Sequence, residues 1–372
     1  GVSELQPAHW ARFSQSGLRI CRYWACEDAP HADSFEQTAE KVRWLVLDAI
    51  ERQLVSDVPL CAFLSGGLDS SLLSAVAARR MKEMGRELTT FSVDYEDNDR
   101  YFTAGHFQPE SDNRYIELMN RELGVSHQTV VLKTEDVAAA LMEAVRARDL
   151  PGMADVDSSL LLFCREMKKH ATVALSGECA DEIFGGYPWF RDPDVREKYG
   201  FPWAQSTAYR AGFLRPEWRS VIDAEGYVDE RYRATLCDTS LLPGLSPTER
   251  RMKEMIHLNE KWFMQTLLDR KDRMSMFSGL EVRVPFCDHR IAEYLYTVPW
   301  EMKEYHGHEK GLLRYAMRGL LPEKVLWRKK SPYPKTHHPD YLSAVSSMLQ
   351  KILSQPDAPV FQIVERSALA AL

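Results

Sequence analysis

Residues 58–77, V-P-L-C-A-F-L-S-G-G-L-D-S-S-L-L-S-A-V-A, constrain the fold more than any other stretch of the chain. Residues 58–64 are an apolar run of strand length, and apolar residues recur at helical spacing over residues 68–84. The small residues Ser65, Gly66 and Gly67 separate the two segments and suit a tight turn. The pattern therefore predicts a buried strand, a glycine turn and a helix in direct succession.

This turn carries groups that suit a phosphate. Backbone N–H groups at a helix start have no partner within the helix and form an anion site, and Ser65 and Ser70 add hydroxyl donors. Asp69 is unfavourable beside a phosphate unless a cation joins it, which indicates Mg²⁺. The alternative is an ordinary strand-to-helix turn with a capping Asp. The turn is neither a Walker A loop nor a G-x-G-x-x-G loop.

Three more short apolar runs are expected to be strands: residues 88–93, 127–132 and 171–175. Strands that alternate with helices predict an α/β fold, in which helices cover both faces of a parallel sheet. Ligands bind such sheets beyond the carboxyl ends of the strands, where Leu64, Val93 and Leu175 are expected.

The chain divides into three expected parts. Residues 1–33 are a lead-in with two short strands, over residues 1–9 and 18–23. Residues 34–191 are an α/β core that opens on a helix, where Ser34 and Gln37 have the spacing of a capping box. Residues 192–372 are expected to be mainly helical, without strands. A long helix is expected there over residues 247–268.

A second motif follows the last predicted strand of the core: L-S-G-E-C-A-D-E-I-F-G-G-Y, residues 175–187. Glu178, Asp181 and Glu182 are three carboxylates within five residues, and they repel one another unless solvent or a cation separates them. The alternative is an acidic helix start that the helix dipole favours. Because both motifs follow strands of one predicted sheet, we favour a shared site.

Two later stretches mix charged and apolar residues. Residues 268–288 include Arg270 and Asp272, and they form either a structural ion-pair cluster or a wall of the site, since buried charges must pair. Residues 325–335, V-L-W-R-K-K-S-P-Y-P-K, place Lys330 between an apolar Trp and two prolines. A basic run is usually a solvated face, but this setting indicates a held loop in which Lys330 faces phosphate.

Composition excludes several classes of protein. The formal net charge of −7 argues against a surface that coats nucleic acid. No apolar run approaches the ~20 residues of a membrane-spanning helix. The seven cysteines include no C-x-x-C pair, which predicts reduced thiols in a cytoplasmic protein.

Four motifs in this order, S-G-G-L-D-S-S, L-S-G-E-C-A-D-E-I-F-G-G-Y, G-L-E-V-R-V-P-F-C-D and W-R-K-K, resemble the synthetase domain of glutamine-dependent asparagine synthetases. The first motif resembles the pyrophosphate loop (PP-loop) of the N-type ATP pyrophosphatases, whose fold is adenine nucleotide alpha hydrolase-like. The resemblance implies that Mg-ATP adenylates the side-chain carboxylate of aspartate and releases pyrophosphate. Ammonia then displaces AMP to give asparagine.

The resemblance also implies roles for the matching positions. The residues expected to bind ATP are Leu64, Ser65, Gly66, Gly67, Asp69, Ser70, Val93, Ser176 and Gly177. Asp69 and Asp181 are expected to hold Mg²⁺. The expected catalytic residues are Glu178, Lys330, Arg270 and Asp272. Of these, Glu178 receives ammonia and manages its proton, Lys330 neutralises charge on the phosphates, and the other two bind aspartate.

In that family an amino-terminal glutaminase domain, with an amino-terminal Cys nucleophile, supplies the ammonia. This chain begins with Gly1, and residues 1–23 resemble the end of that domain and its linker. We therefore expect a part of a longer protein that cannot hydrolyse glutamine by itself. Its expected partners are aspartate, ATP, ammonia and the glutaminase domain, without nucleic acid or membrane. Whether it forms a homodimer stays open.

Three alternatives remain. A related PP-loop ligase would form a lactam or another amide from a different carboxylate, although lactam-forming relatives tend to carry Tyr at the position of Glu178. An RNA-thiolating relative would share the loop, but the acidic charge and the lack of catalytic cysteine pairs count against it. A nucleotide-binding scaffold without catalysis is the third, and the intact Asp69, Glu178, Asp181 and Lys330 count against it.

Overall fold

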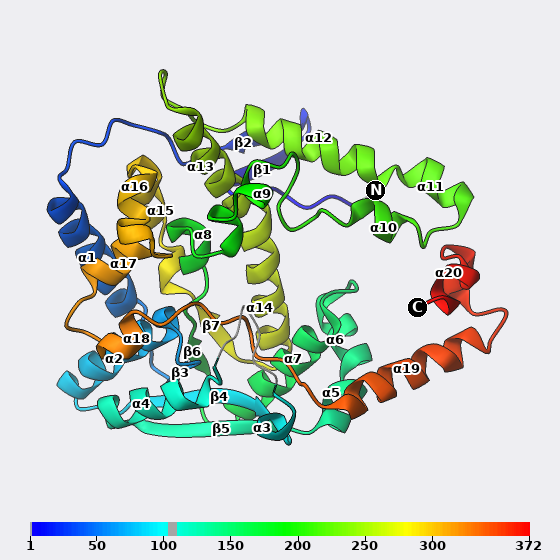
Figure 1. Cartoon of the computed structure of the whole chain (residues 1–372), viewed down its shortest axis with the longest axis horizontal. Coiled ribbons are helices and arrows are strands. Elements are labelled where there is room, and N and C mark those ends of the chain that lie inside the picture. The colour runs from blue at the N-terminus through cyan, green and yellow to red at the C-terminus, as the bar shows by residue number, and fades with distance from the viewer. Residues whose placement is uncertain (1, 103–109) are drawn as a thin grey trace.

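The computed structural model describes residues 2–102 and 110–372, and it contains a five-stranded sheet in the order β5-β4-β3-β6-β7 (Figure 1). All neighbouring strands in this sheet are parallel. The strands are β3 (Leu60–Phe63), β4 (Thr89–Tyr95), β5 (Ser126–Leu132), β6 (Val173–Leu175) and β7 (Glu281–Arg283). The first four were predicted from the sequence.

The prediction that no strand follows residue 192 is wrong, because β7 pairs with β6 and completes one edge of the sheet. Glu281 opposes Val173 and Arg283 opposes Leu175. A three-residue strand with a charged residue at each end has no apolar run or alternation that periodicity can detect. The later part of the chain therefore contributes directly to the sheet that carries the first two motifs.

Alternate residues of the central strands face two separate apolar cores. Leu60 and Ala62 of β3 belong to one core, whereas Cys61 and Phe63 pack in the other. This division follows from the side-chain period of two along a strand. The predicted α/β fold, with helices on both faces of a parallel sheet, is confirmed.

Different helices build the two cores. The first core includes α1 (Phe35–Arg52), α2 (Leu68–Glu83), α4 (Asn113–Leu123), α8 (Ala180–Phe184), α15 (His289–Thr297), α17 (Gly311–Ala316) and α18 (Glu323–Leu326). The second includes α6 (Leu141–Arg148), α7 (Ala154–Lys168) and α14 (Gln265–Phe277). The predicted capping box of α1 is present, with Ser34 and Gln37 bonded to each other's backbone N–H.

The remaining helices lie mainly in the later part of the chain. They are α3 (Asn98–Tyr101), α5 (Thr134–Ala139), α9 (Pro193–Arg196), α10 (Thr207–Ala211), α11 (Pro216–Ile222), α12 (Ala224–Cys237), α13 (Pro247–Leu258), α16 (Trp300–Lys303), α19 (Pro339–Leu353) and α20 (Arg366–Ala370). The predicted long helix is α13, which continues through a π-helical turn (Asn259–Met264) into α14.

The lead-in forms an antiparallel hairpin of β1 (His9–Ser14) and β2 (Gly17–Arg22). The strand expected over residues 18–23 is confirmed, but the one expected over residues 1–9 is wrong, because β1 begins where that range ends and residue 1 lies outside the described residues. Arg22 ties the hairpin to the end of α12 through an ion pair with Asp238 at 2.7 Å. None of the described helices is long and apolar enough to cross a membrane.

Candidate active site

The first two motifs meet at the carboxyl ends of β3 and β6, which are neighbours in the sheet. Gly177 of the second motif lies against the first: a Cβ added to it would come within 2.9 Å of the Ser70 nitrogen and 3.0 Å of the Asp69 carbonyl carbon. Contacts this short require glycine at position 177. The two motifs therefore touch through their backbones, as a shared site requires.

The loop of the first motif is shaped by one glycine. Gly66 has a φ of +69°, and a Cβ there would lie 2.8 Å from the Tyr115 Cβ and 2.9 Å from the Ile116 nitrogen. The Ser65 and Ser70 hydroxyl oxygens lie 2.9 Å apart across the turn. Both hydroxyls are therefore directed to one small region at the start of α2, next to backbone N–H groups that suit an anion.

Two carboxylates and two lysines form a cluster, here called the site cluster: Asp69, Asp181, Lys310 and Lys330. Lys310 is buried, and the other three are partly buried. The Lys310 Nζ lies 2.5 Å from Asp69 Oδ2 and 2.8 Å from Asp181 Oδ1. Lys330 Nζ donates to Asp181 Oδ2. Lys310 therefore joins the two carboxylates that the sequence assigned to a metal, and Lys330 reaches one of them.

The charges in the site cluster support one another. Burial alone would raise the pKa of Asp181, but Lys310 and Lys330 together hold it well below its usual range. Burial raises the pKa of Asp69, which contacts Lys310 alone among these lysines. Burial would lower the pKa of Lys310, yet the two carboxylates raise it. Asp181 is thus the carboxylate that the cluster keeps charged most firmly.

Sequence reasoning missed Lys310. It lies directly before α17, is almost completely buried, and reaches Asp69 across 241 positions of the sequence. A single lysine between Glu309 and Gly311 follows no periodic pattern and belongs to none of the four motifs. No signal in the sequence alone would have identified it.

Glu178 has a lysine partner that was also missed. Its Oε1 lies 3.2 Å from the Nζ of Lys271, and its side chain is 20% exposed. Lys271 is 5% exposed and lies 4.3 Å from the ring centroid of Phe63 on β3. The charged stretch around residue 271 therefore borders the site.

The two neighbours of Lys271 are placed differently. Arg270 is buried, its Nη1 contacts the Met153 sulfur at 3.5 Å, and its Nε has no hydrogen-bond partner among the described residues. The Asp272 side chain is exposed, on the other side of Lys271 in the sequence. The roles in aspartate binding that were predicted for Arg270 and Asp272 stay predictions.

The residues expected around adenosine lie at or near strand ends. Leu64 is buried directly after β3, and its N–H donates to the Phe91 carbonyl at 2.8 Å. Ser176 is buried directly after β6, and its N–H donates to the Arg283 carbonyl of β7 at 2.9 Å. Val93 is half-buried on β4, which continues to Tyr95, two residues beyond the expected strand end.

Comparison with known proteins identifies the family. Residues 41–372 match the family described as asparagine synthase. The chain belongs to the asparagine synthase family.

The relatives are longer than this chain. It is 52% identical over 373 residues to asparagine synthetase [glutamine-hydrolyzing] 3 of Bacillus subtilis, covering 100% of this chain and 60% of that protein. It is 26% identical to the human asparagine synthetase [glutamine-hydrolyzing], covering 91% of this chain and 52% of that protein. A more distant likeness is to the NH₃-dependent NAD synthetase of Campylobacter jejuni, at 11% identity and a TM-score of 0.29, covering 63% of this chain and 97% of that one.

Lys330 lies in the loop that was expected to be held in place. Its backbone N–H donates to Glu309 Oε1 at 2.8 Å, and the same oxygen accepts from Arg314 at 3.1 Å. The Lys330 ammonium lies 4.9 Å from the ring centroid of Tyr187, whose hydroxyl donates to Glu182 at 2.5 Å. Both ends of Lys330 are therefore fixed.

The carboxylates of the site fit a magnesium ion of the kind that binds nucleotides. Asp69 Oδ1 is buried and has no hydrogen-bond partner among the described residues. Residues 2–102 and 110–372 contain no group of three or more His, Cys, Asp or Glu side chains that would form a complete metal cage. Mg²⁺ bound to phosphates needs only one or two carboxylates and keeps several waters, so Asp69 Oδ1, unpartnered among the described residues, suits such an ion.

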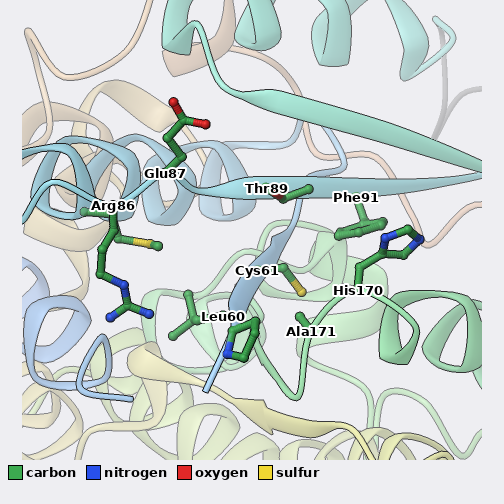
Figure 2. Close-up of a pocket in the computed structure, with 10 residues that line it drawn as sticks. Leu60, Cys61, Arg86, Glu87, Thr89, Phe91, His170 and Ala171 are labelled. Carbon is green, nitrogen blue, oxygen red and sulfur yellow. The ribbon is translucent and has the colours of Figure 1, made fainter. Parts of the chain in front are cut away.

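A separate cavity of about 320 Å³ lies at the amino ends of β3 and β4, the opposite ends from the two motifs (Figure 2). Its lining includes Leu60 and Thr89, the first residues of β3 and β4, together with His170, whose ring lies 5.5 Å from that of Phe91. None of the candidate site residues lines it. The candidate site residues lie instead at the carboxyl ends of the strands, where the two motifs meet.

Proposed function

We propose that this chain carries out the synthetase reaction of asparagine formation. Mg-ATP adenylates the side-chain carboxylate of aspartate, and ammonia then displaces AMP. The observation that carries this proposal is the meeting of the pyrophosphate loop with Asp181, Glu178, Lys310 and Lys330 at the ends of neighbouring strands. Membership of the asparagine synthase family supports it.

ATP would lie over the carboxyl ends of β3, β4 and β6. The loop hydroxyls of Ser65 and Ser70 and the N–H groups at the start of α2 suit pyrophosphate oxygens. Leu64, Val93, Ser176 and Gly177 would line the adenosine. Asp69 and Asp181 would hold Mg²⁺, which supplies positive charge where the leaving pyrophosphate becomes more negative.

In the first step a carboxylate oxygen of aspartate forms a bond to the α-phosphorus, and the bond from that phosphorus to the bridging oxygen breaks. The bridging oxygen leaves with pyrophosphate. Lys310 and Lys330 lie at the same strand ends, so their ammonium groups would stabilise the negative charge that develops on the leaving pyrophosphate. Holding both substrates in line makes the attack effectively unimolecular, which is worth up to about 7–11 kcal/mol of barrier.

In the second step the ammonia nitrogen forms a bond to the activated carbonyl carbon, and the bond from that carbon to the AMP oxygen breaks. The nitrogen must lose one proton to become a neutral amide. Glu178 accepts that proton, since its carboxylate lies in the turn between β6 and α8, three residues before Asp181. Arg270 and Asp272 remain our candidates for holding aspartate.

The source of ammonia is the second part of the proposal. The curated relatives are named as glutamine-hydrolysing, and this chain spans 60% of the length of the Bacillus subtilis protein. We propose that a glutaminase domain belonging to the same polypeptide delivers ammonia, in a cytoplasmic enzyme. The chain alone should therefore use free ammonia and release no glutamate from glutamine.

The test measures pyrophosphate release by the chain with Mg-ATP and ammonium, with and without aspartate, and identifies the amino-acid product. Aspartate-dependent release together with asparagine is the expected result. Pyrophosphate release that does not depend on aspartate would point to another carboxylate substrate, as in a lactam- or amide-forming relative. Nucleotide binding without pyrophosphate release would favour the non-catalytic scaffold.

A further inference from the structure

We infer that Lys271 positions Glu178 for the amide-forming step. This inference rests on the proposed function and deepens it, because it concerns how the same site receives ammonia. Lys271 touches Glu178 rather than the reacting atoms, so it is a positioning residue.

The surroundings of Lys271 leave Glu178 as its ion-pair partner among the described residues. Its side chain is almost completely buried on α14, and the one carboxylate with which it pairs among the described residues is Glu178, at 3.2 Å. A buried ammonium without a counter-charge is strongly destabilising. The pair therefore fixes where the Glu178 carboxylate can lie.

Aromatic rings complete the support of Lys271. Its Nζ lies 4.3 Å from the ring centroid of Phe63, within the range of a cation–π contact. Phe63 in turn packs edge-on against Phe163 of α7, with ring centroids 5.3 Å apart. Because Phe63 is the last residue of β3, the sheet holds the ammonium beside the site.

The two oxygens of Glu178 are unequal as a result. Oε1 faces Lys271, whereas Oε2 is buried and has no hydrogen-bond partner among the described residues. A buried acceptor without a partner is costly in a folded protein, and such atoms often serve a function. Oε2 is thus the oxygen that accepts the proton from the ammonia nitrogen as the C–N bond forms.

Lys271 is separate from the phosphate machinery. Lys310 and Lys330 pair with Asp69 and Asp181, and no ion pair joins Lys271 to either aspartate within the described part of the chain. Replacing Lys271 should therefore affect the capture of ammonia more than the release of pyrophosphate. An adenylate that is not captured by ammonia reacts with water, which returns aspartate and AMP.

The chain offers a matched control in Lys253 on α13. Lys253 is 4% exposed, pairs with Asp28 at 2.8 Å, and lies 5.2 Å from the ring centroid of Tyr296. It is thus another buried lysine with a close carboxylate and an aromatic ring, and its partner lies in the lead-in rather than in the site. Lys253→Met should disturb folding as Lys271→Met does, without touching Glu178.

The experiment measures asparagine formed per pyrophosphate released, and the KM for ammonium, in the full chain and three variants. In Lys271→Met we expect the ratio to fall at least about 10-fold, which is less than the roughly 100-fold or more that complete loss of the proton acceptor would cost. Lys271→Arg should restore part of the ratio because it keeps the charge, and Lys253→Met should leave it unchanged.

The outcomes separate the two proposals. A parent chain that forms no asparagine from aspartate would overturn the proposed function and this inference with it. A parent chain that forms asparagine, with the same ratio in Lys271→Met as in the parent, would overturn the inference alone. A ratio that falls equally in Lys253→Met would also overturn it, because general loss of packing would then explain the effect.

Discussion

Two clusters of lysines and acidic groups behave differently in this protein. The site cluster is Asp69, Asp181, Lys310 and Lys330. The second, here called the lead-in cluster, contains Cys26, Asp28, Lys253, Glu260 and Lys303, and it joins the lead-in to α13, the π-helical turn and α16. Every member of the site cluster makes an ion pair. In the lead-in cluster, neither Glu260 nor Lys303 makes one among the described residues, although each influences the pKa of the other.

The difference lies in what burial does to each charge. In the lead-in cluster, burial raises the pKa of Glu260 to about 7 and lowers that of Lys303 to about 7, so both groups move toward their neutral forms. In the site cluster, direct contact with two lysines outweighs burial, and the pKa of Asp181 falls. Burial alone therefore moves a group toward its neutral form, whereas close pairing with two lysines keeps Asp181 charged.

The largest loss of stability is expected when Lys253 of the lead-in cluster is replaced. Lys253→Met leaves Asp28 buried without its ammonium, and breaking a buried pair in this way costs about 3–5 kcal/mol of unfolding free energy. Urea denaturation of parent and variant measures this loss. Pyrophosphate release per folded molecule should stay at the parent level, and a fall in it would mean that the lead-in cluster supports the site.

The corresponding change in the site cluster is Lys310→Met. It removes the ammonium shared by Asp69 and Asp181, and we expect aspartate-dependent pyrophosphate release to fall about 100-fold or more, as when a preorganised charge-stabilising group is lost. Steady-state rates at saturating ATP test this. Lys253→Met is the control for loss of a buried lysine, and a Lys310→Met rate close to that of the parent would contradict the role of Lys310.

The pH dependence of stability tests the lead-in cluster. The pKa of Glu260 is raised from 4.5 to about 7, so the folded state binds more protons than the unfolded state between these values. Its stabilising contribution is complete below pH 4.5 and is lost as pH rises through 7. Glu260→Gln should remove this slope, which amounts to at most about 1.4 kcal/mol per pH unit.

Denaturation midpoints at pH 5 and pH 7 measure the slope in parent and variant. Lys303 has the opposite effect above pH 7. Its pKa is lowered from 10.5 to about 7, so the unfolded state binds more protons between these values, and the free energy of unfolding should rise again with pH above 7. Equal pH slopes in the parent and Glu260→Gln would show that folding does not raise the pKa of Glu260.

The sequence predicted those parts of the site that follow from local pattern. The succession of β3, loop and α2 is visible in apolar spacing, and the strand ends located Asp69, Glu178 and Asp181. Lys330 was found because two prolines and a Trp indicated a held loop. Each of these signals lies within a few residues of the side chain that it identifies.

The missed residues depend on contacts between distant positions. Lys310 meets Asp69 across 241 positions, Lys271 meets Glu178 from another helix, and β7 exists because it pairs with β6. A single buried lysine or a three-residue charged strand has no period of its own, so one sequence contains no pattern that reveals it. The lead-in cluster was missed for the same reason.

The smallest expected effect concerns two glycines with the same backbone angle at opposite ends of α2. Gly66 and Gly85 both have a φ of +69°, but of these two only Gly66 would bring a Cβ against other atoms, at 2.8 Å from Tyr115 and 2.9 Å from Ile116.

Gly85→Ala should cost the left-handed strain alone, about 1–2 kcal/mol, and leave the KM for ATP unchanged. Gly66→Ala adds a backbone collision beside the site, so it should lose more stability and raise the KM for ATP. Urea denaturation and ATP titration of both variants measure these quantities, and equal effects at the two positions would mean that the shape of the loop does not matter for the nucleotide.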